Sequence, residues 1–102
     1  MGFEMWGYQF EGAFSSADML KASSGVYVIR CEEGKNWKVL DVGEASDVKA
    51  RVTNHDRADC WRSNCSGTIR YSATYTSGMT EEQRRQIEQS IRSQANPPCG
   101  EV

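Results

Sequence analysis

Arg51 and His55 are the two residues of this chain best suited to act on a phosphate group. They are four residues apart, and His55 is the only histidine, so on a helix their side chains would be neighbours. A guanidinium group can hold a phosphate with two hydrogen bonds, and an imidazole can move a proton near neutral pH. The competing interpretation is a solvated helix edge with a half-buried histidine, and the pair alone does not decide between them.

Glu88 and Tyr27 could take part in the same chemistry. Glu88 borders the apolar stripe of the last predicted helix, but it is also four residues from both Arg84 and Arg92, as in a surface ladder of ion pairs. Tyr27 lies in the middle of a predicted strand, where most tyrosines pack with the hydroxyl on a nearby partner. Either residue becomes a site candidate only if it faces Arg51 across a cleft.

Hydrophobic patterning predicts the elements that must position these side chains. Residues 25–31 are β-branched or aromatic on both faces, which is typical of a central strand, and residues 37–42 form the returning strand of a hairpin. Simple alternation places Trp37, Val39 and Asp41 on one face of that second strand. A helix should begin at Ser46 or Asp47, and residues 56–67 have no clear period and are expected to be a loop.

A third strand and a second helix complete the predicted core. Residues 69–76 alternate apolar and polar, as in a strand with one buried face. Thr80 to Gln83 form a capping box that opens the last helix, and Pro97 and Pro98 end it. The fold class is therefore predicted to be α+β, with a three-stranded antiparallel sheet flanked by helices in the order β-β-α-β-α.

The first 24 residues are expected to form an extension that packs on this core, which would occupy residues 25–102. They contain five aromatic residues and a short SSADMLKASS segment. Ser15 or Ser16 could cap one or two helical turns in that segment.

Composition indicates one soluble domain. The chain has 102 residues, 38% of them hydrophobic, and a net charge of −2, which gives no global electrostatic argument for nucleic acid. It has neither an apolar run that could span a bilayer nor a signal peptide pattern, so a cytoplasmic location is expected, with no membrane partner.

The four cysteines are expected to be reduced thiols for the same reason. Zinc is a less favoured alternative: His55, Cys60 and Cys65 follow one another at five-residue steps, whereas structural zinc sites use closer pairs such as C-x2-C.

The residues in question occur in an order that resembles the GIY-YIG nucleases. The resemblance runs from about Gly25 to Pro98. The first family motif is similar to Gly25-Val26-Tyr27 and the second to Asp41-Val42-Gly43, and the later family residues match the following positions: Arg51, His55, Glu88 and Asn96.

Asp41 is the one departure from this pattern, because the family has a tyrosine there. Both family tyrosines sit beside the attacking water, so the substitution leaves two hypotheses open. Asp41 could bind a second metal or act as a base, or the fold could have been kept after catalysis was lost.

The resemblance implies hydrolysis of a phosphodiester in nucleic acid, with DNA expected ahead of RNA. Glu88 would hold one Mg²⁺ or Mn²⁺ ion, Tyr27 would orient or deprotonate water, His55 would accept a proton and Arg51 would neutralise developing charge, with Gly43 and Asn96 in support.

The alternative function is an inactive module that binds nucleic acid or protein. The segment from Lys49 to Arg70 is locally basic. Phosphates would be bound there by Lys49, Arg51, Arg57, Arg62 and Arg70. Trp61 could stack on a base or could equally belong to the core.

Overall fold

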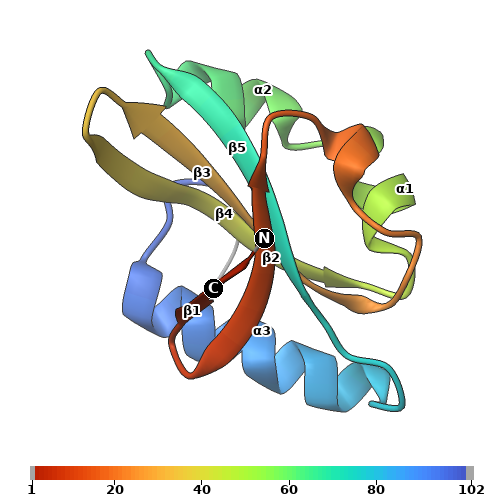
Figure 1. The fold of residues 1–102 in the computed structure, drawn as a ribbon. Coiled ribbons are helices and arrows are strands. Elements are labelled where there is room, and N and C mark those ends of the chain that lie inside the picture. The colour runs from red at the N-terminus through yellow and green to blue at the C-terminus, as the bar shows by residue number, and fades with distance from the viewer. Residues whose placement is uncertain (1, 101–102) are drawn as a thin grey trace.

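The computed structural model describes residues 2–100 and contains a five-stranded antiparallel sheet with helices on both faces (Figure 1). The strand order is β1-β2-β5-β3-β4. The strands are β1 (Gly2–Met5), β2 (Tyr8–Phe14), β3 (Gly25–Glu33), β4 (Asn36–Ala45) and β5 (Thr68–Tyr75). The helices are α1 (Val48–Thr53), α2 (Ala58–Ser63) and α3 (Glu81–Ala95), with a 3-10 turn η1 (Ala17–Met19). The structure is an α+β fold, but the predicted three-stranded sheet is wrong.

The two additional strands come from the N-terminal segment, which extends the sheet. β1 pairs with β2, and β2 pairs with β5. Trp6 and Gly7, the two residues between β1 and β2, both have positive φ angles of 55° and 84°, the backbone geometry that matches the twist of a two-residue hairpin. Phe3 and Phe10 then stack across the pair with ring centroids 5.3 Å apart. The predicted helical turn does form at η1, where Ser16 accepts a hydrogen bond from the Asp18 backbone amide.

β3 is the central strand that its sequence predicts. It is hydrogen-bonded to β4 on one side and β5 on the other, and its residues Val26 to Ile29 are all buried. Val26 and Val28 pack in the cluster on the α3 side, whereas Tyr27 and Ile29 pack in the cluster beneath α1 and α2. Tyr27 therefore points toward the layer that carries His55.

A β-bulge in β4 changes the direction of Asp41. The register pairs Ile29 with Asp41 but Arg30 with Val39, so Leu40 is an extra residue in β4. Val39 consequently packs with Val42 on the α3 side, and the predicted shared face of Val39 and Asp41 is wrong. The bulge places Asp41 on the same face as Tyr27.

Residues 56–67, expected to be a loop, contain α2. Trp61 in this helix is 3% exposed and belongs to the core. The apolar periodicity of α2 is not visible in the sequence, because the helix has six residues and this is too few for an apolar stripe to repeat. The capping box of α3 is confirmed: Thr80 and Gln83 exchange side-chain hydrogen bonds with each other's backbone amides.

The cysteines form two disulfides, so the prediction of reduced thiols is wrong in this structure. Cys31 is bonded to Cys65, and Cys60 to Cys99. The zinc alternative would have used Cys60 and Cys65 as ligands, but the sulfur atom of each is in a disulfide bond. Within residues 2–100, no helix has the length and apolar character required to cross a bilayer.

Candidate functional site

The centre of the candidate site is a hydrogen bond between two buried side chains. The Tyr27 hydroxyl lies 2.6 Å from Nε2 of His55. Tyr27 is 1% exposed and His55 6%. Gly43, the strand partner of Tyr27 on β4, leaves room for this ring, because a Cβ at Gly43 would lie 2.1 Å from the hydroxyl oxygen. The structure thus gives Gly43 a specific supporting contact with Tyr27.

The other two side chains of the candidate site are Arg51 on α1 and Glu88 on α3. The Arg51 side chain is 40% exposed, and its Nη2 atom lies 3.3 Å from Oδ1 of Asp56. The Glu88 side chain is 21% exposed and accepts a hydrogen bond from Nε of Arg92 at 3.4 Å. Burial raises the pKa of the Glu88 carboxyl, and the nearby Glu44 carboxylate raises it as well, whereas Arg92 opposes the shift.

The pKa of Tyr27 indicates that these charges act on one hydroxyl. Burial raises this pKa to about 12, the cations Arg57 and Arg51 oppose the shift, and the carboxylates Asp41 and Glu88 add to it. Arg51 and Glu88, on α1 and α3, are therefore both within electrostatic reach of the Tyr27 hydroxyl, which is hydrogen-bonded to His55.

His55 is held at both ring nitrogens. Nε2 faces Tyr27, and Nδ1 accepts a hydrogen bond from the Arg57 backbone amide at 3.0 Å. Burial lowers the pKa of His55 to about 4, and the cations Arg51 and Arg57 lower it further, whereas Asp41 and Asp56 oppose the shift. The imidazole is therefore neutral at pH 7.

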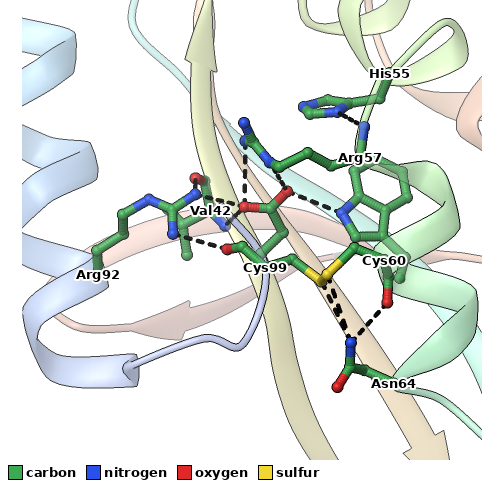
Figure 2. The surroundings of a disulfide bond; sticks show 9 residues. Val42, His55, Arg57, Cys60, Asn64, Arg92 and Cys99 are labelled. Carbon is green, nitrogen blue, oxygen red and sulfur yellow. Dashed lines mark hydrogen bonds and ion pairs between the residues drawn. A yellow bond between two sulfur atoms is a disulfide. The ribbon is translucent and has the colours of Figure 1, made fainter. Parts of the chain in front are cut away.

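Asp41 is enclosed by hydrogen-bond donors, among them Val42, Arg57 and Arg92, which Figure 2 labels. It is 0% exposed. Arg57 donates to both of its oxygens at 2.8 and 3.3 Å, and the Trp61 indole donates at 2.8 Å. The Val42 amide donates to Oδ1 at 2.8 Å, and Arg92 from α3 pairs with the same oxygen. Asp41 thus links elements from both faces of the sheet, and its geometry is that of a buried structural anion rather than of a solvent-facing base.

The chain after α3 closes over this network. Cys99 donates its amide to the Leu40 carbonyl at 3.0 Å and accepts from Nη1 of Arg92 at 3.0 Å. The Cys60–Cys99 disulfide then joins this segment to α2, where Asn64 donates to the Cys60 carbonyl (Figure 2). The disulfide therefore holds the segment after α3 against α2, beside Asp41.

The remaining predicted residues lie around this centre. Asn96 is exposed and is the C-cap of α3, with a left-handed φ of 49°. Its contact is with the end of the helix. Lys49 is half-buried, and Arg62 is exposed and paired with Asp59. Trp61 is a core residue bound to Asp41, so the prediction that it stacks on a base is not supported by its position.

Sequence reasoning missed the ion pairs that Arg57 and Arg92 form with Asp41. They join residues 16 and 51 positions apart, and no spacing rule connects such residues before the fold is known. A weak signal was the aspartate itself, since a carboxylate within an apolar strand is usually paired when it is buried.

A cavity of about 370 Å³ lies elsewhere, between η1, α1, α2 and β5. Its wall includes Ser15, Asp18, Thr53, Trp61 and Tyr71, and none of the four groups described above lines it. Because Trp61 borders this cavity and also donates to Asp41, its ring separates the two regions. The candidate site is therefore defined by its side chains and not by this cavity.

Comparison with protein-family models, curated proteins and solved structures found no match for this chain.

Proposed function

We propose that this protein hydrolyses phosphodiester bonds in nucleic acid with the help of a divalent cation. The observation that carries the proposal is the Tyr27–His55 hydrogen bond of 2.6 Å, with Arg51 and Glu88 both close enough to affect the Tyr27 pKa. Metal-assisted hydrolysis needs a group that orients water, a cation that neutralises developing charge and an oxygen ligand for the metal. This cluster supplies one of each.

Each side chain has a role that follows from its position. Tyr27 would hold the attacking water through its hydroxyl, and His55 would fix the direction of that hydroxyl. Arg51 is the exposed cation of the group, so it would bind the scissile phosphate and stabilise the charge that builds on it. The resemblance to GIY-YIG nucleases assigns the same roles to Tyr27 and Arg51, whereas it makes His55 a proton acceptor.

Glu88 is suited to holding the cation. Within residues 2–100, only Oε2 of its carboxylate has a hydrogen-bond partner, which leaves Oε1 for a ligand. Mg²⁺ and Mn²⁺ prefer oxygen ligands and keep several waters. When bound, such an ion supplies Lewis-acid stabilisation of the phosphate oxygens.

A second candidate is a module that binds nucleic acid without cleaving it. The specific observation in its favour is the 1% exposure of Tyr27, since a buried hydroxyl has little contact with water. In that case Arg51 and Arg62, with exposed side chains, would contact phosphates, and no metal would be required.

The two disulfides favour an oxidising compartment over the predicted cytoplasm as the place where the protein acts, because cytosolic thiols are normally kept reduced. DNA or RNA met outside the reducing cytosol would then be the substrate.

Substitution of Glu88 by glutamine tests the proposed function. Glu88→Gln keeps the size of the side chain but removes the charge that holds the cation, so Mg²⁺-dependent cleavage of a labelled DNA should be abolished while the fold is retained. Glu82→Gln, on the exposed face of the same helix, is the matched control and should cleave normally. Cleavage by Glu88→Gln at the wild-type rate would refute the metal assignment.

The same protein samples distinguish the nuclease from the module that only binds nucleic acid. Fluorescence anisotropy with labelled DNA, measured in EDTA and in Mg²⁺, reports binding alone. Equal binding in both conditions, without cleavage by the wild-type protein in Mg²⁺ or Mn²⁺, would favour the binding module.

A further inference from the structure

We propose that Asp41 and Arg57 are positioning residues that hold His55 as a hydrogen-bond donor to Tyr27. The aspartate in the second motif then acts through Arg57 and the histidine rather than on the substrate. This inference rests on the proposed function, in which the Tyr27 hydroxyl meets the reacting water.

Asp41 provides the fixed end of this chain of contacts. It is fully buried, and its two oxygens accept from Arg57, from the Trp61 indole, from the Val42 amide and from Arg92. A carboxylate that is saturated by donors has no lone pair directed at a substrate. It can, however, hold a cation in one place, because separating a buried ion pair is costly.

Arg57 connects Asp41 to His55 through two different groups. Its guanidinium binds both Asp41 oxygens, at 2.8 and 3.3 Å, and its backbone amide donates to Nδ1 of His55 at 3.0 Å. Fixing the guanidinium therefore also fixes the peptide that contacts the imidazole. The Arg57 side chain is 29% exposed, so part of it faces solvent.

The contact at Nδ1 determines which ring nitrogen carries the proton. A neutral imidazole has one N–H group, and a nitrogen that accepts a hydrogen bond is the one without it. Nδ1 also lies 3.2 Å from Oδ1 of Asp56, which would favour a proton on Nδ1. The Arg57 amide can only donate, however, and at 3.0 Å it is the closer group, so we place the proton on Nε2, which lies 2.6 Å from the Tyr27 oxygen. His55 therefore donates to Tyr27, which changes the predicted role of His55 from proton acceptor to donor.

This direction has a chemical consequence for Tyr27. Its oxygen accepts from His55, so its own proton is left to point toward a water or a phosphate oxygen. A donor at the oxygen also favours the phenolate if Tyr27 gives up that proton. The charged groups around His55 are Arg51, Arg57, Asp41 and Asp56, and their balance with burial keeps the ring neutral at pH 7.

Nitrogen NMR of the 102-residue chain tests the inference, because its single histidine gives an unambiguous ring signal. A long-range ¹H–¹⁵N correlation spectrum of wild type at pH 7 should place the proton on Nε2. Arg57→Ala should shift the ring toward a mixture of the two tautomers and lower kcat for DNA cleavage about 10- to 100-fold, as for other residues that orient a histidine. KM should change far less than kcat.

Two further variants complete the experiment. Arg57→Lys keeps the cation and should restore part of the wild-type spectrum and rate, and it replaces Arg57→Ala if that variant does not fold. Arg30→Ala is the matched control: Arg30 is also a partly buried arginine paired with a carboxylate, but it stacks on Phe3 on the opposite face of the sheet. It should leave the His55 signals unchanged.

The outcomes separate this inference from the proposed function. A wild-type proton on Nδ1, or His55 signals and kcat unaffected by Arg57→Ala, would overturn the positioning role. If the wild-type proton is on Nε2 and Arg57→Ala loses this preference, the positioning role is supported. This holds even if the protein cleaves no nucleic acid, in which case only the proposed function fails.

Discussion

Asp41 and His55 are buried polar side chains whose partners decide what they can do. Asp41 is surrounded by donors, whereas His55 has one donor at Nδ1 and the Tyr27 hydroxyl at Nε2. Burial costs each of them hydration that these hydrogen bonds must replace. The consequence for His55 is a neutral ring over most of the physiological pH range.

The stability of the protein should depend on pH through His55. Its pKa is about 4 in the folded state against an ordinary value of 6.5, so between these pH values the unfolded chain binds a proton that the folded chain excludes. The free energy of unfolding should therefore fall as pH is lowered from 6.5 toward 4 and change no further below that through this group. The expected loss is roughly 3 kcal/mol, at about 1.4 kcal/mol per pKa unit.

Urea denaturation at a series of pH values measures this loss. His55→Gln removes the titrating group while the acidic residues continue to titrate, so its stability should depend less on pH over this range. Parallel curves for wild type and His55→Gln would contradict the assigned burial of His55.

At the scale of elements, two irregular features build the site. The bulge at Leu40 turns Asp41 toward Tyr27, and the six-residue helix α2 carries both Trp61 and Cys60 into the same region. The segment after α3 then crosses the edge of β4 and is joined to α2 by Cys60–Cys99. The site therefore depends on the docking of this segment as well as on the regular strands.

Loss of the Cys60–Cys99 disulfide should disturb the site, and loss of the other disulfide should not. The two close loops of similar size, with sequence separations of 39 and 34 residues, so removing either should cost about 2–5 kcal/mol of stability. Only Cys99 contacts Arg92 and β4 beside Asp41. The double variant Cys60→Ala/Cys99→Ala should therefore change the His55 ring signals.

The matched control is Cys31→Ala/Cys65→Ala, compared by denaturation and by the same NMR spectrum. Equal spectral changes in the two double variants would mean that the C-terminal segment has no particular connection to the site.

The regular elements were predictable because their signals are local. β3, β4, β5, α1 and α3 occur where period-two alternation, a capping residue or the proline pair indicated them. The β1–β2 hairpin was missed because its turn is Trp6-Gly7, not one of the common Asn-Gly or Asp-Gly pairs, and because its pairing with β5 joins residues about 60 positions apart. The disulfides and the Asp41 ion pairs were missed for the same reason, since they are set by tertiary contacts.

On the scale of the whole molecule, the sheet separates two apolar clusters. One lies beneath α1 and α2, and the other lies between the sheet and α3 (Figure 1). The proposed site spans the sheet at the edge strand β4: Tyr27 packs in the cluster beneath α1 and α2, whereas Glu88 is on α3. Under the proposed function, this arrangement would let groups distant in sequence act on one phosphate.

The central claim is that the Tyr27 hydroxyl takes part in Mg²⁺-dependent cleavage of nucleic acid. Tyr27→Phe removes one oxygen atom and keeps the buried ring, so the fold should lose about 1–3 kcal/mol, because the buried His55 nitrogen is left without its hydrogen-bond partner. The most direct measurement is the turnover of a labelled DNA in Mg²⁺ by wild type and by Tyr27→Phe, with folding checked by thermal denaturation. We predict that wild type cleaves the DNA and that turnover falls about 100-fold or more in the variant; equal turnover by the two proteins, or no cleavage by wild type in Mg²⁺ or Mn²⁺, would contradict the claim.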